Sequence, residues 1–379
     1  MDDLALHGGK PVRETMLPYG HQSIDQADIQ TVVEALKGDT ITRGMTIERF
    51  EQAVADYCGA KYAVAMSSGT AALHAACIVA GIGKGDRVIV SVVTFIATAN
   101  AAIYCGGRPV FCDIDPDTIC IDSKQIEKLI TSKIKAIIPV DFGGYPADMG
   151  GIMAIAQRHD LVVIEDACHS LGATYKGRKI GTLTDMTCFS FHPVKVITTG
   201  EGGMVVTDSP DYEWALRKIR NHGIMRNSPW DYGIESLGYN YWMSDIAAAL
   251  GLSQLGKLDG FIARRRQIAL AYGIAFQVPT IGMYDSAWHL YILQLEGLDR
   301  DTIIAALRAE GIGATVHYKP LHLHPYYQRK YNYKEGDFPM AEDYYKRAIT
   351  LPLFPAMTDK DVTDVIEAVK KVIGYYRRC

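Results

Sequence analysis

The sequence has no long hydrophobic run, no paired cysteines and no strongly basic segment. A membrane-spanning helix needs about 18 consecutive apolar residues, and no run approaches that length. The opening residues, MDDLALHGGKPVRE, lack the charged and then apolar regions of a secretory signal. We therefore expect a cytoplasmic protein without a membrane partner.

The eight cysteines are scattered, and none forms the C-x-x-C pairs typical of zinc or redox sites. We expect reduced, mostly buried thiols and no metal. The formal net charge is −4, and basic residues do not alternate with aromatics as in a nucleic-acid groove. The one basic cluster, ARRRQ at 263–267, suits an exposed helix face. Nucleic acid is therefore not an expected partner.

The 379 residues, 48% hydrophobic and 22% charged, are typical of a soluble globular protein with a large and a smaller domain. From about 61 to 208, short β-rich runs alternate with amphipathic helical patterns. This alternation predicts an α/β fold in which helices cover both faces of a mostly parallel sheet. Ligands of such sheets bind beyond the carboxyl ends of the strands.

The periodicity changes in the C-terminal third of the sequence. A long helical pattern from about 245 to 276 is followed by a strand–helix–strand pattern in WHLYILQLEG, DRDTIIAALRAEGI and ATVHYKP. A last amphipathic helix, TDKDVTDVIEAVKKVIGYY, opens with Thr358 as a capping residue. We therefore predict a large domain over 1–255, with an N-terminal arm, and a smaller α+β domain over 256–379.

Lys195 lies in FSFHPVKVITTGEGG, where a strand-forming segment gives way to a turn. A turn fixes the pose of a lysine amine, and an amine with a lowered pKa can condense with a carbonyl. If the carbonyl belongs to pyridoxal 5′-phosphate (PLP), the site also needs a phosphate cradle, a carboxylate for the pyridine nitrogen and a flat group against the ring. An ordinary surface lysine is the alternative.

The cradle and the carboxylate each have a candidate after an expected strand. The segment SSGTAALHAA at 67–76 opens a helix, so its N–H groups, Gly69 and the hydroxyls of Ser68 and Thr70 suit a phosphate, although Ser-Gly-Thr is often only a cap and turn. Asp166 ends LVVIED and can pair with a protonated pyridine nitrogen. Glu165 should point to the opposite face of the sheet.

Three further residues follow the same pattern. Phe95, after RVIVS, can stack on the cofactor ring, and His169 can bond its phenolic oxygen. Ser190, five residues before Lys195, is a phosphate ligand candidate. Each also has a plain structural interpretation, as core phenylalanine, structural histidine or strand serine. Their coincidence at the ends of successive strands favours a PLP site.

The motifs SSGTAAL, TFIATAN, IEDACHSLGA, FSFHPVK, TTGEGG and GYNYWMSDIAAALGLSQL, in this order, resemble the PLP-dependent sugar aminotransferases of the DegT/DnrJ/EryC1/StrS family over nearly the whole chain. The resemblance implies the PLP-dependent transferase fold type I. It implies that Lys195 binds the cofactor covalently and carries the substrate proton. It also implies a homodimer in which Asn240 of GYNY reaches the phosphate held by the other subunit. The remaining cofactor residues that it implies are Gly69, Thr70, Phe95, Asp166, His169 and Ser190.

The resemblance also implies the reaction. The family's dehydratases carry histidine in place of Lys195, so amino transfer is favoured, from L-glutamate to a 4-keto-6-deoxy sugar nucleotide. His317 and Tyr318, at the end of ATVHY, are expected to face this sugar nucleotide; a core tyrosine beside an exposed histidine is the alternative.

The exact sugar stays open. LPYGHQSID, DSAWHLYIL and VHYKPLHLHPYY resemble UDP-4-amino-4,6-dideoxy-N-acetyl-β-L-altrosamine transaminases of pseudaminic acid synthesis. PADM, AWHLYI and LPLFPAMTD resemble UDP-4-amino-4-deoxy-L-arabinose aminotransferases. Trp242 stands where many relatives have arginine.

The sequence disfavours two other classes of function. A PLP-binding regulator without catalysis is disfavoured by the intact Lys195, Asp166 and His169. A nucleotide-binding oxidoreductase would carry G-x-G-x-x-G after its first strand, whereas GIGKGD at 81–86 follows a helical pattern.

Overall fold

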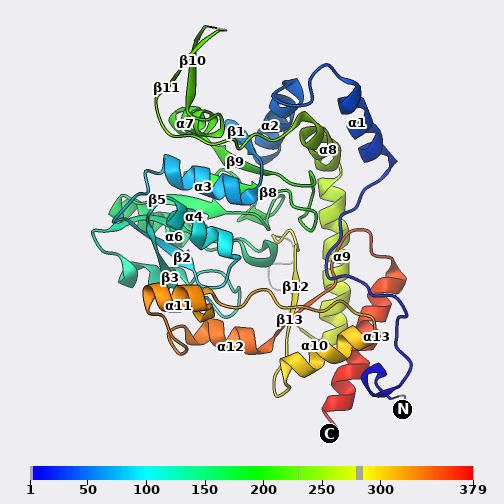
Figure 1. The fold of residues 1–379 in the computed structure, drawn as a ribbon. Coiled ribbons are helices and arrows are strands. Elements are labelled where there is room, and N and C mark those ends of the chain that lie inside the picture. Colours follow the sequence, from blue (N-terminus) through cyan, green and yellow to red (C-terminus); the bar gives the residue numbers. More distant parts are fainter. Residues whose placement is uncertain (1–2, 229, 279–284, 379) are drawn as a thin grey trace.

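The computed structural model describes residues 3–228, 230–278 and 285–378. Within these residues, a seven-stranded sheet has the order β1-β9-β8-β5-β4-β2-β3 (Figure 1). The pairs from β8 to β3 are parallel, whereas β9 is antiparallel to both of its neighbours. The predicted α/β fold with a mostly parallel sheet is therefore confirmed. The strands of this sheet are β1 Tyr62–Met66, β2 Arg87–Ser91, β3 Arg108–Cys112, β4 Ile134–Ile138, β5 Val162–Asp166, β8 Met186–Ser190 and β9 Gly203–Thr207.

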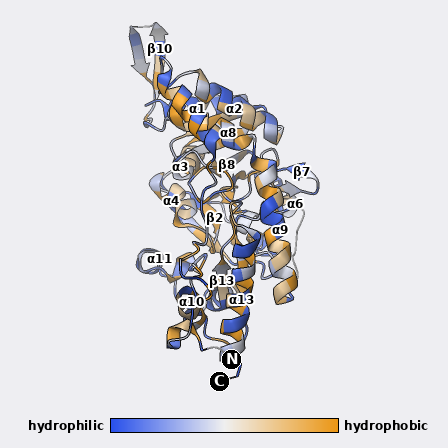
Figure 2. Cartoon of the chain, turned by 90° about the vertical axis from the view of Figure 1, so that its right-hand side faces the viewer, coloured by the Kyte–Doolittle hydropathy of each residue, from blue (hydrophilic) through white to orange (hydrophobic). Residues whose placement is uncertain are grey.

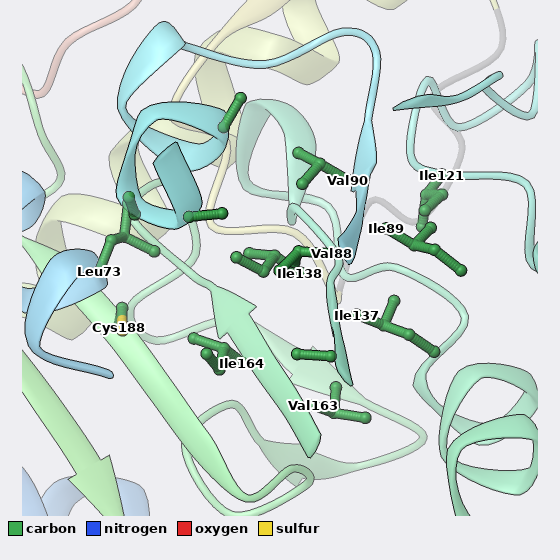
Figure 3. Close-up of a cluster of buried hydrophobic side chains, with 14 of the residues drawn as sticks. Leu73, Val88, Ile89, Val90, Ile121, Ile137, Ile138, Val163, Ile164 and Cys188 are labelled. Atoms are coloured by element: carbon green, nitrogen blue, oxygen red, sulfur yellow. The ribbon is translucent and has the colours of Figure 1, made fainter. Parts of the chain in front are cut away.

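In β1, β8 and β9, alternate residues pack into two hydrophobic clusters, one on each face of the sheet, whereas consecutive residues of β2, β4 and β5 all belong to the first cluster. In β1, Val64 belongs to the cluster that contains helix α3, whereas Ala63 and Ala65 belong to the cluster with α2 and α8. Side chains alternate between the faces of a strand, so both faces are covered by helices. Figure 3 shows part of the first cluster, with Leu73 of α3 beside Cys188 of β8 and Ile164 of β5, and with apolar side chains of β2 and β4 farther along the sheet. The α-helices are α1 Gln26–Lys37, α2 Met45–Cys58, α3 Gly69–Val79, α4 Ile96–Tyr104, α5 Ser123–Ile126, α6 Met149–His159, α7 Pro210–Arg220, α8 Asp245–Leu255, α9 Leu258–Phe276, α10 Arg300–Ala309, α11 Pro325–Tyr331, α12 Pro339–Arg347 and α13 Asp359–Tyr376, with 3-10 turns at Ala5–His7, Glu127–Leu129, Phe142–Gly144 and Leu321–Leu323.

The helical pattern over 245–276 forms two helices, α8 and α9, which separate at Gly256. Helix α9 then runs along the molecule from the central sheet to α10 and α13 (Figure 1). Its first half contributes Leu258 and Ile262 to a sheet cluster, and its second half contributes Ile268 to a third cluster with α10 and α13. Leu4 of the N-terminal arm packs in that third cluster. The division into domains at residue 256 remains our proposal.

One predicted strand is wrong. The segment ATVHY forms no strand, and its only ladder contact is an isolated bridge between Thr315 and Thr350. The partner of β12 is instead β13, a run of four buried residues that follows α12 directly. Because every residue of β13 is buried, it lacks the alternation that would mark it as a strand in the sequence. The smaller strands are β6 Thr174–Tyr175, β7 Arg178–Lys179, β10 Ile224–Ser228, β11 Asp231–Ile234, β12 Tyr291–Gln294 and β13 Ala348–Leu351.

The hairpin of β10 and β11 projects from the body at the end opposite the two termini (Figures 1 and 2). It exposes apolar side chains, including Trp230, Tyr232 and Ile234. None of the helices in the described part of the chain is long and apolar enough to cross a membrane. The cysteines of the described residues are free, and most of them are buried.

Candidate active site

A cavity of about 610 Å³ opens at the carboxyl ends of the central strands. Strands β1, β5 and β8 all point toward this edge, so the loops that follow them meet there. This edge is where the sequence places its candidates. The predicted site residues that line the cavity are Gly69, Thr70, Phe95, Asp166, His169, Ser190, Lys195, His317 and Tyr318.

The loop between β1 and α3 forms one wall. Ser68 caps α3, because its hydroxyl accepts a hydrogen bond from Ala71 N at 3.1 Å. A β-carbon on Gly69 would lie 2.8 Å from the β-carbon of Ser190, so this position has no room for a side chain. The N-terminus of α3, Thr70 and Ser190 therefore enclose a small space lined by donors, which suits an anion.

Lys195 belongs to the turn that follows β8, and its backbone N–H donates to the carbonyl of His192 at 2.9 Å. The side chain is partly exposed and lines the cavity. Enclosure by the protein lowers the pKa of the Lys195 amine, while Cys168 and Asp166 act in the opposite direction. A larger share of the amine is therefore neutral than in a surface lysine.

Asp166 ends β5 and is only 4% exposed. Its Oδ2 accepts a hydrogen bond from the Thr98 hydroxyl at 2.6 Å, and its Oδ1 accepts from Cys168 N at 3.2 Å. Thr98 in turn lies 2.7 Å from the hydroxyl of Thr94. The carboxylate is thus held in one orientation at the cavity wall.

His169 is buried between the sheet edge and the C-terminal part of the chain. Its Nδ1 accepts a hydrogen bond from Gly143 N at 3.3 Å, which leaves Nε2 as the nitrogen that carries the proton. Nε2 lies 3.4 Å from the hydroxyl of Tyr318. Burial, with Lys195 and His317 nearby, lowers the pKa of His169 well below its usual value. The ring is therefore a neutral donor toward the cavity.

Aromatic side chains also line the cavity. Phe95 is 53% exposed at the start of α4, and its ring lies 6.1 Å from that of Tyr318. His317 bonds Thr350 Oγ1 through Nδ1 at 2.9 Å, and its ring contacts Tyr19 at 4.9 Å. Burial lowers the pKa of His317 to about 4, so it is neutral at physiological pH.

Asn240 lies outside this cavity. It is exposed and forms a bridge with Asn221. Trp242 also points elsewhere: its indole nitrogen donates to Asn221 Oδ1 at 3.1 Å, and its ring contacts the guanidinium of Arg220 at 3.9 Å. It lines a separate cavity of about 310 Å³ that includes Arg43.

Two carboxyl groups are buried beneath the site. Asp141 accepts hydrogen bonds from Ala147 N at 2.9 Å and from the Ser170 hydroxyl at 2.6 Å. Glu165 accepts from the Thr187 hydroxyl at 2.8 Å, and its Oε1 has no partner among the described residues. Burial raises the pKa of Asp141 to about 7 and that of Glu165 well above its usual value, and each group acts on the other.

Sequence reasoning missed several lining residues. Tyr19 and Thr98 have the clearest contacts, and Thr94, Cys168 and Glu201 also line the cavity. The spacing of Thr94 and Thr98, four residues apart at the start of a helix, is a signal that their hydroxyls meet. Tyr19 carries no such signal, because the arm folds back from a distant part of the sequence.

Comparisons with known proteins agree with this geometry. Residues 22–370 match the DegT/DnrJ/EryC1/StrS aminotransferase family. The spore coat polysaccharide biosynthesis protein SpsC of Bacillus subtilis is 45% identical over 381 residues, which cover 95% of this chain and 98% of that protein.

Solved structures with the same fold include Helicobacter pylori PseC, an aminotransferase involved in the biosynthesis of pseudoaminic acid. The TM-score is 0.91 at 30% identity, with 95% of this chain and 100% of that chain covered. Spr1654 of Streptococcus pneumoniae, solved in its PLP form, has a TM-score of 0.90 at 32% identity, with 95% and 99% covered.

Proposed function

Because the chain belongs to the DegT/DnrJ/EryC1/StrS aminotransferase family and is a PLP-dependent sugar aminotransferase, we propose that it transfers the amino group of L-glutamate to a 4-keto sugar nucleotide. We propose a UDP-linked 6-deoxy sugar as the acceptor, made for a bacterial surface glycan or a nonulosonic acid. The observation that carries the proposal is the single cavity in which the amine of Lys195, the carboxylate of Asp166 and an anion cradle meet. The names of SpsC and PseC support the two product classes.

The residues present fit PLP. The position of Gly69 has no room for a β-carbon, so backbone donors and the hydroxyls of Thr70 and Ser190 can approach a phosphate closely. Asp166 would pair with a cationic ring nitrogen, Phe95 would lie against the ring, and the Nε2 proton of His169 would meet a phenolic oxygen.

When bound, PLP supplies a carbonyl that primary amines attack and a ring that withdraws electrons from the substrate carbon. Lys195, whose pKa is lowered, would offer a neutral amine to that carbonyl and would carry a proton to and from the substrate carbon. Asp166, which Thr98 holds in one orientation, would keep the ring nitrogen charged. Neutral His169 donates a hydrogen bond without adding a charge.

The sugar nucleotide would enter past the C-terminal part of the chain. His317 and Tyr318 line the cavity, and Tyr19 contacts His317 from the N-terminal arm. These three side chains offer ring faces and polar atoms at the cavity wall. We assign them to the acceptor rather than to the cofactor.

We propose a homodimer in which Asn240 completes the partner's phosphate site. In its own chain Asn240 is exposed and outside the cavity, which supports a role toward a second copy. Exposed apolar side chains nearby, Tyr104 of α4 and Leu237, are suited to burial in such an interface.

The test is a screen of 4-keto sugar nucleotides, generated in place by different dehydratases, with glutamate as the amino donor. We expect one UDP-linked 6-deoxy acceptor to give an amino product by mass spectrometry. A product only from a UDP-4-keto-pentose would favour the alternative, the 4-amino-4-deoxy-L-arabinose reaction. If glutamate converts none of these acceptors and never completes a half-reaction, the protein is a PLP-binding protein without this activity.

A further inference from the structure

His74 on helix α3 is a buried histidine that does not line the active-site cavity. It is 5% exposed. Its Nδ1 lies 2.9 Å from the hydroxyl of Tyr241, and its Nε2 is buried without a hydrogen-bond partner among the described residues. The ring also meets Tyr239 edge-on at 5.1 Å and Tyr104 at 5.4 Å. His74 therefore joins α3 to the segment that contains Asn240.

The two tyrosines on either side of Asn240 share one side of their segment. Their rings are stacked, with centroids 4.9 Å apart and planes 8° apart. Asn240 lies between them in extended, bridged backbone, so its side chain points the opposite way and is exposed. The orientation of Asn240 thus depends on where the tyrosine pair is anchored.

Backbone hydrogen bonds hold the segment at both tyrosines, and His222 N also donates to Tyr239 O at 2.9 Å. Tyr239 N donates to Ile219 O at 2.7 Å, and Tyr241 N donates to Arg220 O at 3.1 Å. The Tyr241 carbonyl accepts from Ser67 N at 2.8 Å, so the segment also touches the loop before α3. His74 is the side chain that contacts both stacked rings from the helix beneath them.

The hydrogen bond joins two neutral groups. Burial lowers the pKa of His74, so the imidazole is neutral, and burial raises the pKa of Tyr241, so the phenol keeps its proton. The Tyr241 hydroxyl can therefore donate to Nδ1, with the ring proton on Nε2. Phenylalanine at position 74 would keep the packing and lose this bond.

We propose that His74 is a positioning residue that anchors the Tyr239–Tyr241 segment and so aims Asn240 at the phosphate site of the second subunit. The inference rests on the proposed shared site. On this proposal, a substitution of His74 weakens PLP binding in the other subunit. His74 also lies on α3, whose N-terminus forms the phosphate cradle of its own chain, so the alternative is that the substitution weakens PLP binding in the same subunit. Placing the substitution in one subunit at a time distinguishes the two.

The experiment uses mixed dimers with two affinity tags, isolated by tandem purification. One chain carries Lys195→Ala and cannot bind PLP covalently. The other chain keeps Lys195, and its PLP content is measured; we call it the reporting chain. PLP on the reporting chain is trapped with borohydride and counted by intact mass over a range of PLP concentrations. This readout gives the PLP affinity of one defined site and needs no substrate.

We expect His74→Phe in the Lys195→Ala chain to weaken PLP binding on the reporting chain about fivefold, the effect of losing one hydrogen bond. The same substitution in the reporting chain should leave that affinity unchanged. His74→Asn, whose amide can reach Tyr241, should restore most of the affinity. Tyr241→Phe should add little to His74→Phe, because both remove the same bond.

Asn240→Asp in either chain is the control for the shared site. If it weakens the reporting site only from within the reporting chain, the shared site is refuted and the inference fails with it. Suppose instead that Asn240→Asp in the Lys195→Ala chain weakens PLP binding on the reporting chain, so that the shared site stands. The role of His74 is then refuted if His74→Phe weakens that binding only from within the reporting chain, equally from both chains, or from neither. Equal loss with His74→Asn and His74→Phe also refutes the hydrogen-bond role.

Discussion

Replacing Asp141 with asparagine should remove a pH-dependent loss of stability from the folded enzyme. Asp141 and Glu165 are buried side by side beneath the active site, and burial raises the pKa of both. In the unfolded chain Asp141 ionises near its usual pKa, whereas in the folded chain it holds its proton until about pH 7. The folded state therefore binds more protons between these values, and stability falls as pH rises through them.

The size of the effect follows from the same numbers. Raising the pKa of Asp141 from 3.8 to about 7 corresponds to about three pKa units. At about 1.4 kcal/mol per unit, the destabilisation above pH 7 is roughly 4 kcal/mol, and it belongs to the coupled pair rather than to one group. Asparagine has almost the same shape and can still accept from Ala147 N.

The assay is urea unfolding of the PLP-bound wild type and variant at several pH values. The free energy of unfolding of Asp141→Asn minus that of the wild type should rise from about pH 4 to about pH 7. Glu165→Gln should give a rise in the same direction, because burial also raises the pKa of Glu165 well above its usual value. A difference that is constant or falls across this range would refute the reasoning.

Three further predictions concern the cavity. Lys195→Ala should abolish both turnover and the visible absorbance of the bound cofactor; complete catalytic cycles in this variant would contradict the assignment. Asp166→Asn should lower kcat by about a hundredfold or more, as for a lost preorganised electrostatic contact, while the urea midpoint changes little; near wild-type turnover would exclude the role. His317→Ala should raise the KM of the sugar nucleotide and leave the glutamate half-reaction intact, as stopped-flow spectra can show. Equal loss of both half-reactions would indicate a folding defect instead.

The central sheet could be predicted because its strands are short, apolar and separated by amphipathic helices. Residues that follow such strands must meet at one edge, so Asp166, Ser190 and Lys195 could be placed together without coordinates. The alternation that sends Glu165 to the other side was also readable. Its neighbour Asp141 was not, since nothing local connects two residues that meet only through the packing of separate loops.

Contacts between segments that are distant in the sequence could not be predicted. The bond between Thr98 and Asp166 joins residues 68 positions apart, and neither sequence context marks it. In the C-terminal part of the chain, β13 follows a helix without a turn signal and is buried on both sides, so the sequence pattern predicted a strand in ATVHY and none at β13. Hydrophobic periodicity predicts helices and strands that have one buried face, and it does not identify a strand that is buried on both faces.

The structure also changes where the sugar specificity should be sought. Trp242 is the position at which the motif differs from many relatives, and the sequence alone links that difference to the sugar. In the folded chain its ring lies against Arg220, its nitrogen bonds Asn221, and it is absent from the cavity that holds Lys195. A substitution there bears first on the segment that carries Asn240. We therefore propose that, within its own chain, the acceptor is distinguished by side chains of the cavity wall, above all those around His317.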